Sequence, residues 1–224
     1  LIHSSKKELA MNRRRLGISS SYLLTKLIGR LIKDLDFENK NLAFINNSEF
    51  FDDKFSPYND EITHSKTIKF PLTKLDDVKN IKNKFDLIFA SFPFAVKGLD
   101  EKDLCLLTLD NLTTGGIGIY LMPGYHRTFQ SHQGKKFINL VTSSGFRFLA
   151  VLKLPDEFLN PIAGVRCSLV LITTDNGIQD TFFAEYLSDL SRYEDGIYEQ
   201  VLSFGIANLY NLSTQKKLIK HSIN

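Results

Sequence analysis

Four consecutive residues, Ser91-Phe92-Pro93-Phe94, combine a hydroxyl, two aromatic rings and a rigid turn. They follow an apolar run at residues 85–90, whose length and composition predict a strand buried on both faces. Pro93 has no amide proton to donate to a strand ladder, so the strand must end before it. Ligands of open α/β sheets bind at the carboxyl ends of the strands, so the sequence predicts a binding site here.

This stretch resembles the fourth motif of amino-group DNA methyltransferases, in which a buried strand ends in Asn (or Asp)-Pro-Pro-Tyr (or Phe). In that family the Asn accepts hydrogen bonds from the amino group to be methylated, and the aromatic residue stacks on the flipped base. The resemblance puts Ser91 in the place of the Asn and Phe92 in the place of the first Pro, whereas Pro93 and Phe94 match. It therefore implies an altered catalytic motif. A buried strand followed by an ordinary proline turn is the alternative.

Strands and helices alternate after this point. Strands are predicted at 85–90, 117–122, 147–154 and 167–173, and helices at about 100–112, ended by Thr113–Gly116, and at 129–144, interrupted near Gly134 and closed by Gly145. The two helices are crossovers, so the first three strands should run parallel. Only 12 residues precede the fourth strand, too few for a crossover helix, so that strand should run antiparallel between its neighbours.

This order of elements is similar to that of adenine-N6 DNA methyltransferases, above all the modification subunits of type I restriction systems. The matching positions span residues 85–174 and include Leu112, Gly115, Gly116, Pro123, Leu154, Pro155, Phe158 and Ser168–Ile172. The resemblance implies an α/β fold of the Rossmann-like adenosylmethionine-dependent methyltransferase type, with a mostly parallel sheet and one reversed strand. It also implies S-adenosylmethionine as cofactor and DNA as partner, with Phe158 near the flipped base.

The first half of the predicted sheet is short. Strands are predicted at 41–46 and 67–70, and about 40 residues separate the first of them from the strand at 85–90, whereas two full βαβ crossovers need about 60. Members of the family have a glycine-rich loop after the first strand, because only glycine lets the backbone approach the cofactor closely. Here Asn46, Asn47 and Ser48 are followed by bulky residues, and no glycine occurs from position 30 to 97. The sequence therefore predicts a degenerate cofactor region and argues against cofactor binding.

Three segments are expected along the chain. Residues 1–40 should form an N-terminal helical segment, with an amphipathic helix at 22–35. Residues 41–176 should form the methyltransferase-like α/β domain. The C-terminal extension, residues 177–224, should contribute an edge strand near 180–187 and a helix that packs on the domain or leads to a partner.

The composition of the chain indicates which classes of function are possible. The chain has 224 residues, and its 43% hydrophobic and 24% charged content is typical of a globular protein. A net charge of +3 permits nucleic-acid contact without requiring it. The basic residues Lys135, Lys136, Arg147 and Arg166 could reach phosphates or could be scattered surface charge.

The two cysteines, Cys105 and Cys167, have no metal-ligand spacing and are expected to be buried thiols. No signal peptide and no run long enough to span a membrane is present, so we expect a cytoplasmic protein with no membrane partner.

Three functions remain open from the sequence. The leading hypothesis is a methyltransferase-like domain with an impaired catalytic site, which binds DNA or serves as the partner of a specificity or methyltransferase subunit. The second is an active adenosylmethionine-dependent DNA methyltransferase that another chain or segment completes. The third is a protein-interaction module with no nucleic-acid role, which salt-dependent DNA binding would distinguish from the first.

Overall fold

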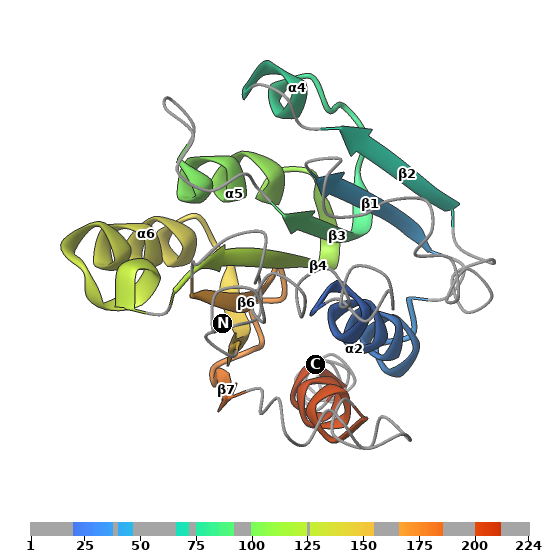
Figure 1. The fold of residues 1–224 in the computed structure, drawn as a ribbon. Coiled ribbons are helices and arrows are strands. Elements are labelled where there is room, and N and C mark those ends of the chain that lie inside the picture. The colour runs from blue at the N-terminus through green and yellow to red at the C-terminus, as the bar shows by residue number, and fades with distance from the viewer. Residues whose placement is uncertain are drawn as a thin grey trace, which may run out of the picture.

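The computed structural model describes eight stretches of the chain, namely residues 20–37, 40–46, 66–71, 75–91, 100–124, 126–154, 166–185 and 200–211. In this part of the chain seven strands form one sheet, with the order β2-β1-β3-β4-β6-β5-β7. Helices cover both faces of the sheet, so the fold has three layers (Figure 1).

The strands are β1 (Asn41–Asn46), β2 (Lys66–Pro71), β3 (Phe85–Ser91), β4 (Leu112–Pro123), β5 (Arg147–Lys153), β6 (Cys167–Thr173) and β7 (Phe182–Glu185). The helices are α2 (Ser20–Asp34), α4 (Leu75–Lys79), α5 (Glu101–Leu109), the π-helical turn η2 (His126–Gln130), α6 (His132–Ser143) and a helix at 200–211. Among the described residues, no helix has both the length and the apolar character needed to cross a membrane.

The strand directions are those that the connection lengths predict. β3 pairs in parallel with β1 and β4, whereas β6 lies between β4 and β5 and is antiparallel to both. The prediction of three parallel strands and one reversed strand is therefore confirmed. The edge strand expected near 180–187 is β7, which runs parallel to β5 at the end of the sheet.

The first half of the sheet is shortened, as predicted. A doubly wound dinucleotide-binding sheet has the order 3-2-1-4-5-6, with three strands on the first side of the switch point. Here the described residues place only β1 and β2 on that side of β3. The described helix between β2 and β3 is α4, which has five residues and is shorter than an ordinary crossover helix.

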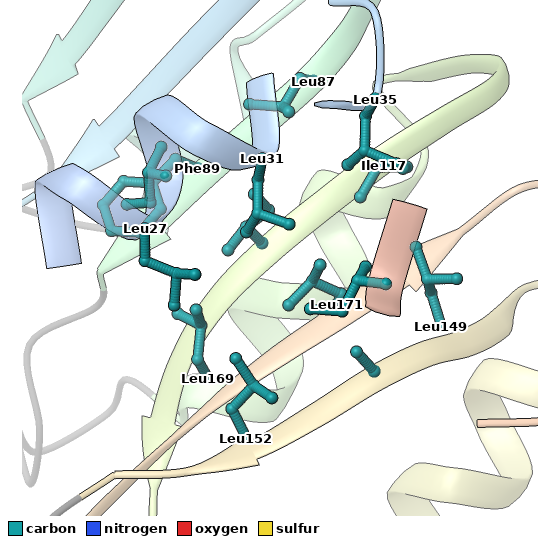
Figure 2. Close-up of a cluster of buried hydrophobic side chains, with 14 of the residues drawn as sticks. Leu27, Leu31, Leu35, Leu87, Phe89, Ile117, Leu149, Leu152, Leu169 and Leu171 are labelled. Atoms are coloured by element: carbon teal, nitrogen blue, oxygen red, sulfur yellow. The ribbon is translucent and has the colours of Figure 1, made fainter. Parts of the chain in front are cut away.

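One face of the sheet packs against α2 and the helix at 200–211. The apolar stripe predicted for residues 22–35 is confirmed over its described side chains, because Leu27 and Leu31 of α2 and Leu35 directly after α2 are buried. Figure 2 shows these leucines over side chains of the sheet, including Leu87 and Phe89 of β3. Burying one such side chain stabilises the fold by about 1.5–3 kcal/mol.

The helix at 200–211 confirms the expectation that the C-terminal extension packs a helix on the domain. Its residues Leu202 and Ile206 join the same buried cluster as α2. Both helices lie on the same side of the sheet in Figure 1. The division of the chain at residues 40 and 176 stays a prediction.

The other face of the sheet is covered by α4, α5 and α6 (Figure 1). Leu104 of α5 and Phe137 of α6 are buried there with Ile88 of β3. Tyr120 of β4 is fully buried in this layer, and Thr108 of α5 donates a hydrogen bond to its hydroxyl oxygen at 3.1 Å. That bond satisfies two polar groups that would otherwise be costly to bury.

Residues Thr113–Gly116 do not end the α5 helix, as the sequence predicted, but belong to β4. Phe85 pairs with Leu112 and Leu87 with Ile117, so four residues of β4 bulge out of the ladder. Gly115 has φ +78°, a conformation that favours glycine. The bulge persists because its polar groups find partners distant in sequence, which local turn preferences do not reveal.

The helix predicted at 129–144 is divided. The π-helical turn η2 precedes Ser131, whose hydroxyl caps α6 by accepting a hydrogen bond from the Gly134 amide. Gly134 lies inside the first turn of α6 rather than at the interruption. Gly145 follows the helix with φ +88° and closes it, as predicted.

Gly134→Ala should destabilise the protein by about 1–3 kcal/mol, because a Cβ at this position would overlap the backbone carbonyl of Thr128. This cost exceeds the gain of up to about 1 kcal/mol in helix propensity. Urea denaturation measures the change. The neighbouring exposed Gln133→Ala should stay within about 0.5 kcal/mol of wild type, and a higher stability for Gly134→Ala would show that η2 and α6 are not in close contact.

Candidate functional site at the carboxyl edge of the sheet

Ser91, which the sequence resemblance puts in the place of the family's Asn, is the last residue of β3 and is buried. Its neighbours in the sheet are Asn46 at the end of β1 and Leu121 of β4. The structure therefore brings together two predicted positions 45 residues apart in sequence, one from the altered motif and one from the expected cofactor region. They meet because parallel strands end at the same edge.

The burial of Ser91 follows from the alternation of side chains along β3. Leu87 and Phe89 point to the face covered by α2, and Ser91 follows them in the same register. At this place the chain offers one hydroxyl oxygen on a short side chain. An Asn side chain offers a carbonyl oxygen and an amide group one bond further out, so serine cannot put its acceptor in the same place.

Arg166 lies at the same edge, immediately before β6. Pro123, the last residue of β4, pairs with Cys167, so Arg166 lies opposite Gly124. A Cβ on Gly124 would come within 3.1 Å of the Cβ of Arg166, which shows how closely the two backbones approach. Arg166 is exposed.

Several predicted site residues lie outside the described part of the chain. They are Asn47 and Ser48 after β1, Phe92, Pro93 and Phe94 after β3, and Phe158 between β5 and β6. The stacking roles implied for Phe94 and Phe158 therefore stay predictions.

Two helices also begin near this edge, because α5 and α6 follow the carboxyl ends of β3 and β4. Asp100 caps α5 by accepting a hydrogen bond from the Lys102 amide at 2.8 Å. The ammonium group of Lys102 is buried and lies 3.5 Å from the same carboxylate. Asp103 is exposed in the first turn of α5, so this helix begins with the acidic residues that its dipole favours.

The cysteines do not supply a nucleophile. Cys105 and Cys167 are both buried and neither is part of a disulfide, as predicted. Burial raises the pKa of Cys167 to about 12 and the pKa of Cys105 well above its usual value, so both remain thiols at neutral pH. Among the described residues, no group of His, Cys, Asp or Glu side chains could hold a metal ion.

The described ends of β1 and β2 supply none of the groups that hold a nucleotide-type cofactor, and the segments that follow these two strands lie outside the described residues. Nucleotide-type cofactors in such folds need a glycine-rich turn after the first strand and an acidic residue for the ribose about 20 residues later. β1 ends in Ile45 and Asn46, and β2 ends in Phe70 and Pro71, so these described ends carry neither glycine nor carboxylate. Asn46 and Pro71 pair directly at this edge.

The sequence did not reveal a cavity of about 410 Å³ at the opposite, amino edge of the sheet. Its lining residues are Leu35, Asp36, Phe37, Lys40, Asp86, Thr113, Thr114, Gly115, Gly116, Tyr210 and Asn211. Asp86 accepts hydrogen bonds from the Asn41 amide and the Thr113 hydroxyl, at 2.9 and 2.8 Å. Tyr210 donates to the Gly115 carbonyl at 2.6 Å. These bonds fasten the β4 bulge and the helix at 200–211 to the sheet.

Several solved structures with a similar arrangement are described as methyltransferases or as parts of restriction-modification systems. A structure described as a class I S-adenosylmethionine-dependent methyltransferase from Listeria monocytogenes matches 84% of this chain and 70% of its own, with a TM-score of 0.60 and 13% identity. The type I restriction-modification methyltransferase subunit from Streptococcus thermophilus matches 71% of this chain, with a TM-score of 0.52 and 10% identity. A type I restriction-modification complex matches 75%, with a TM-score of 0.51 and 10% identity.

These similarities show the fold, which is the Rossmann-like fold of adenosylmethionine-dependent methyltransferases. The matched region covers 46% and 45% of the two restriction-modification chains, so this chain spans less than half of their length. No protein-family model and no curated protein matches the sequence.

Tyr210→Phe should lower the free energy of unfolding by about 0.5–1.5 kcal/mol, because it removes the hydrogen bond to Gly115. Burial, Asp175 and Asp86 raise the pKa of Tyr210, so the folded state holds the phenolic proton more tightly than the unfolded state. The contribution of this proton is full below the unfolded pKa of about 10 and is lost as the pH rises through the folded pKa.

The difference in the free energy of unfolding between wild type and Tyr210→Phe should therefore be smaller at about pH 10.5 than at about pH 8. Urea denaturation of both proteins at the two pH values measures it, and other alkaline effects cancel in the comparison. A difference that stays constant would mean that the folded structure does not raise the pKa of Tyr210.

Proposed function

We propose that this chain is a methyltransferase-like domain related to adenine-N6 DNA methyltransferases, with an impaired catalytic site. It acts in the cytoplasm by binding DNA or as the partner of a specificity or methyltransferase subunit in a restriction-modification complex. The fold and the sequence resemblance around residues 85–174 support this proposal.

The observation that carries the proposal is the position of Ser91. A buried strand of a methyltransferase fold ends at the place where the resembling family has its catalytic Asn, and the residue there is a serine. Methylation of an amino nitrogen requires acceptors that orient the amino group against the methyl donor. A single hydroxyl on a shorter side chain meets that requirement less well than an Asn amide. The sheet that positions the motif is present.

The length of the chain supports the proposed role as a partner subunit. The chain spans less than half of the restriction-modification chains that it resembles in fold. The first half of its sheet is also short, with β1 and β2 alone beyond β3 in the described residues. A second chain could supply what this half lacks, and DNA contact needs only a suitable surface.

An active methyltransferase is the second candidate. The similarity to the Listeria structure over 84% of this chain favours it, because that structure is described as adenosylmethionine-dependent. The two candidates differ in one measurable property, the binding of the methyl donor.

We expect no measurable adenosylmethionine binding by the isolated chain, because the described ends of β1 and β2 lack the glycine and the carboxylate of such sites. For the same reason Ser91→Asn alone should not produce methyl transfer to adenine in DNA. Isothermal titration calorimetry and a methyl-transfer assay test both statements. Micromolar binding, or methyl transfer by the unaltered chain, would instead establish the active enzyme.

If the domain still holds an extruded base, Phe94→Ala should weaken DNA binding by about 1–3 kcal/mol, the value of stacking one base on an aromatic ring. Fluorescence anisotropy with a labelled duplex measures the affinity, and thermal unfolding checks the fold. Phe183→Ala is the control, since Phe183 is an exposed phenylalanine of the edge strand β7. Equal affinities for wild type and Phe94→Ala would leave Phe94 with a packing role.

A further inference from the structure

The charges of this chain are unevenly distributed along the sequence. Residues 111–155 contain five of its 28 Lys+Arg and none of its 25 Asp+Glu. This segment therefore contributes +5 to a chain with a formal net charge of +3, and the remaining residues contribute −2. In the fold the segment forms β4, η2, α6 and β5.

Two of the five cations are already engaged. The Arg147 guanidinium donates hydrogen bonds to two carbonyls at the C-terminal end of α6. They belong to Thr142 in the last turn, at 3.1 Å, and to Phe146 after the helix, at 2.8 Å. Lys153 forms an ion pair with Glu185 of β7 at 2.7 Å. Lys135 and Lys136 of α6 differ from these, because both are exposed and neither has an ion-pair partner in the described part of the chain.

The packing of α6 explains why these lysines face solvent. Gly134, Phe137 and Val141 are buried against η2 and the sheet, at the spacing of one helix face. Lys135 and Lys136 lie on the outer side of the same turn, next to the exposed His132. We call His132, Lys135 and Lys136 the α6 basic face.

Two adjacent helices begin with opposite charge. The free amide groups at the start of a helix carry partial positive charge and favour acidic residues there. α5 follows this preference, with Asp100, Glu101 and Asp103 at its beginning. α6 has no acidic residue in its first turn and has cations instead, so the positive potential of its amides and its side chains adds up.

The α6 basic face lies near the candidate site. α6 follows the carboxyl end of β4 through Gly124 and η2, and Leu121 of β4 pairs with Ser91. The first turn of α6 therefore lies toward the edge of the sheet at which β3 and β4 end. Figure 1 shows α6 beside α5 on one side of the sheet.

We propose that the α6 basic face binds the phosphate backbone of duplex DNA and holds it at the carboxyl edge of the sheet. The inference rests on the proposed DNA-binding function and specifies the surface that performs it. Charge complementarity selects this partner, since unpaired lysines and helix amides are the groups that contact phosphates without reading sequence. The carboxylates at the start of α5 repel the same backbone, so the DNA passes over α6 and not over α5.

The test compares two pairs of exposed lysines in the full chain. Lys135→Gln/Lys136→Gln neutralises the α6 basic face. Lys79→Gln/Lys82→Gln removes the same charge at the amino edge, because both lysines are exposed and precede β3. Fluorescence anisotropy with a labelled duplex of about 20 base pairs, between about 50 and 300 mM salt, gives the affinity and its salt dependence. Thermal unfolding confirms that both variants fold.

Lys135→Gln/Lys136→Gln should lower the affinity at least about tenfold at 0.1 M salt and reduce the slope of log K against log salt by about 2, one for each lost phosphate contact. Lys79→Gln/Lys82→Gln should bind within about twofold of wild type. Equal losses in both variants would show a general charge effect and overturn the inference. Wild-type binding that the α6 variant retains in full would overturn it while leaving DNA binding intact, and failure of the wild-type chain to bind DNA would overturn the proposed function as well.

Discussion

The burial of β3 on both faces is the constraint on which the rest of the structure depends. Leu87 and Phe89 need an apolar layer on one side, and Ile88 and Ala90 need one on the other. A strand of this kind is stable only between two layers of helices. Because parallel neighbours need crossovers, the helices that complete the layers also bring β1, β3 and β4 to end at one edge.

The two edges of the sheet have different roles as a result. At the amino edge, Asp86 and Tyr210 fix the β4 bulge and the last described helix through hydrogen bonds between segments distant in sequence. At the carboxyl edge, Ser91 pairs with Asn46, and Arg166 lies beside Gly124 just beyond the end of β4.

The carboxyl edge combines the geometry of the methyltransferase fold with a serine at the end of β3. Ser91 occupies the end of a central strand, yet its side chain lacks the reach of the amide in the resembling family. The described ends of β1 and β2 carry neither a glycine nor a carboxylate. The exposed lysines of α6 lie toward this edge, so its surface charge favours an anionic partner.

The sequence by itself determined the properties that depend on the periodicity of apolar residues and on the length of the connections between strands. These were the buried strand at 85–90, the stripe of the helix at 22–35, the reversed direction of the strand at 167–173 and the short first half of the sheet. Only the tertiary structure decided that Thr113–Gly116 bulges from β4, because Asp86 and Tyr210 hold it from 27 and 95 residues away. The contact between Ser91 and Asn46 likewise required knowing which strands are neighbours. Local signals cannot report such partners, since the energy of these contacts exists only once the layers have packed.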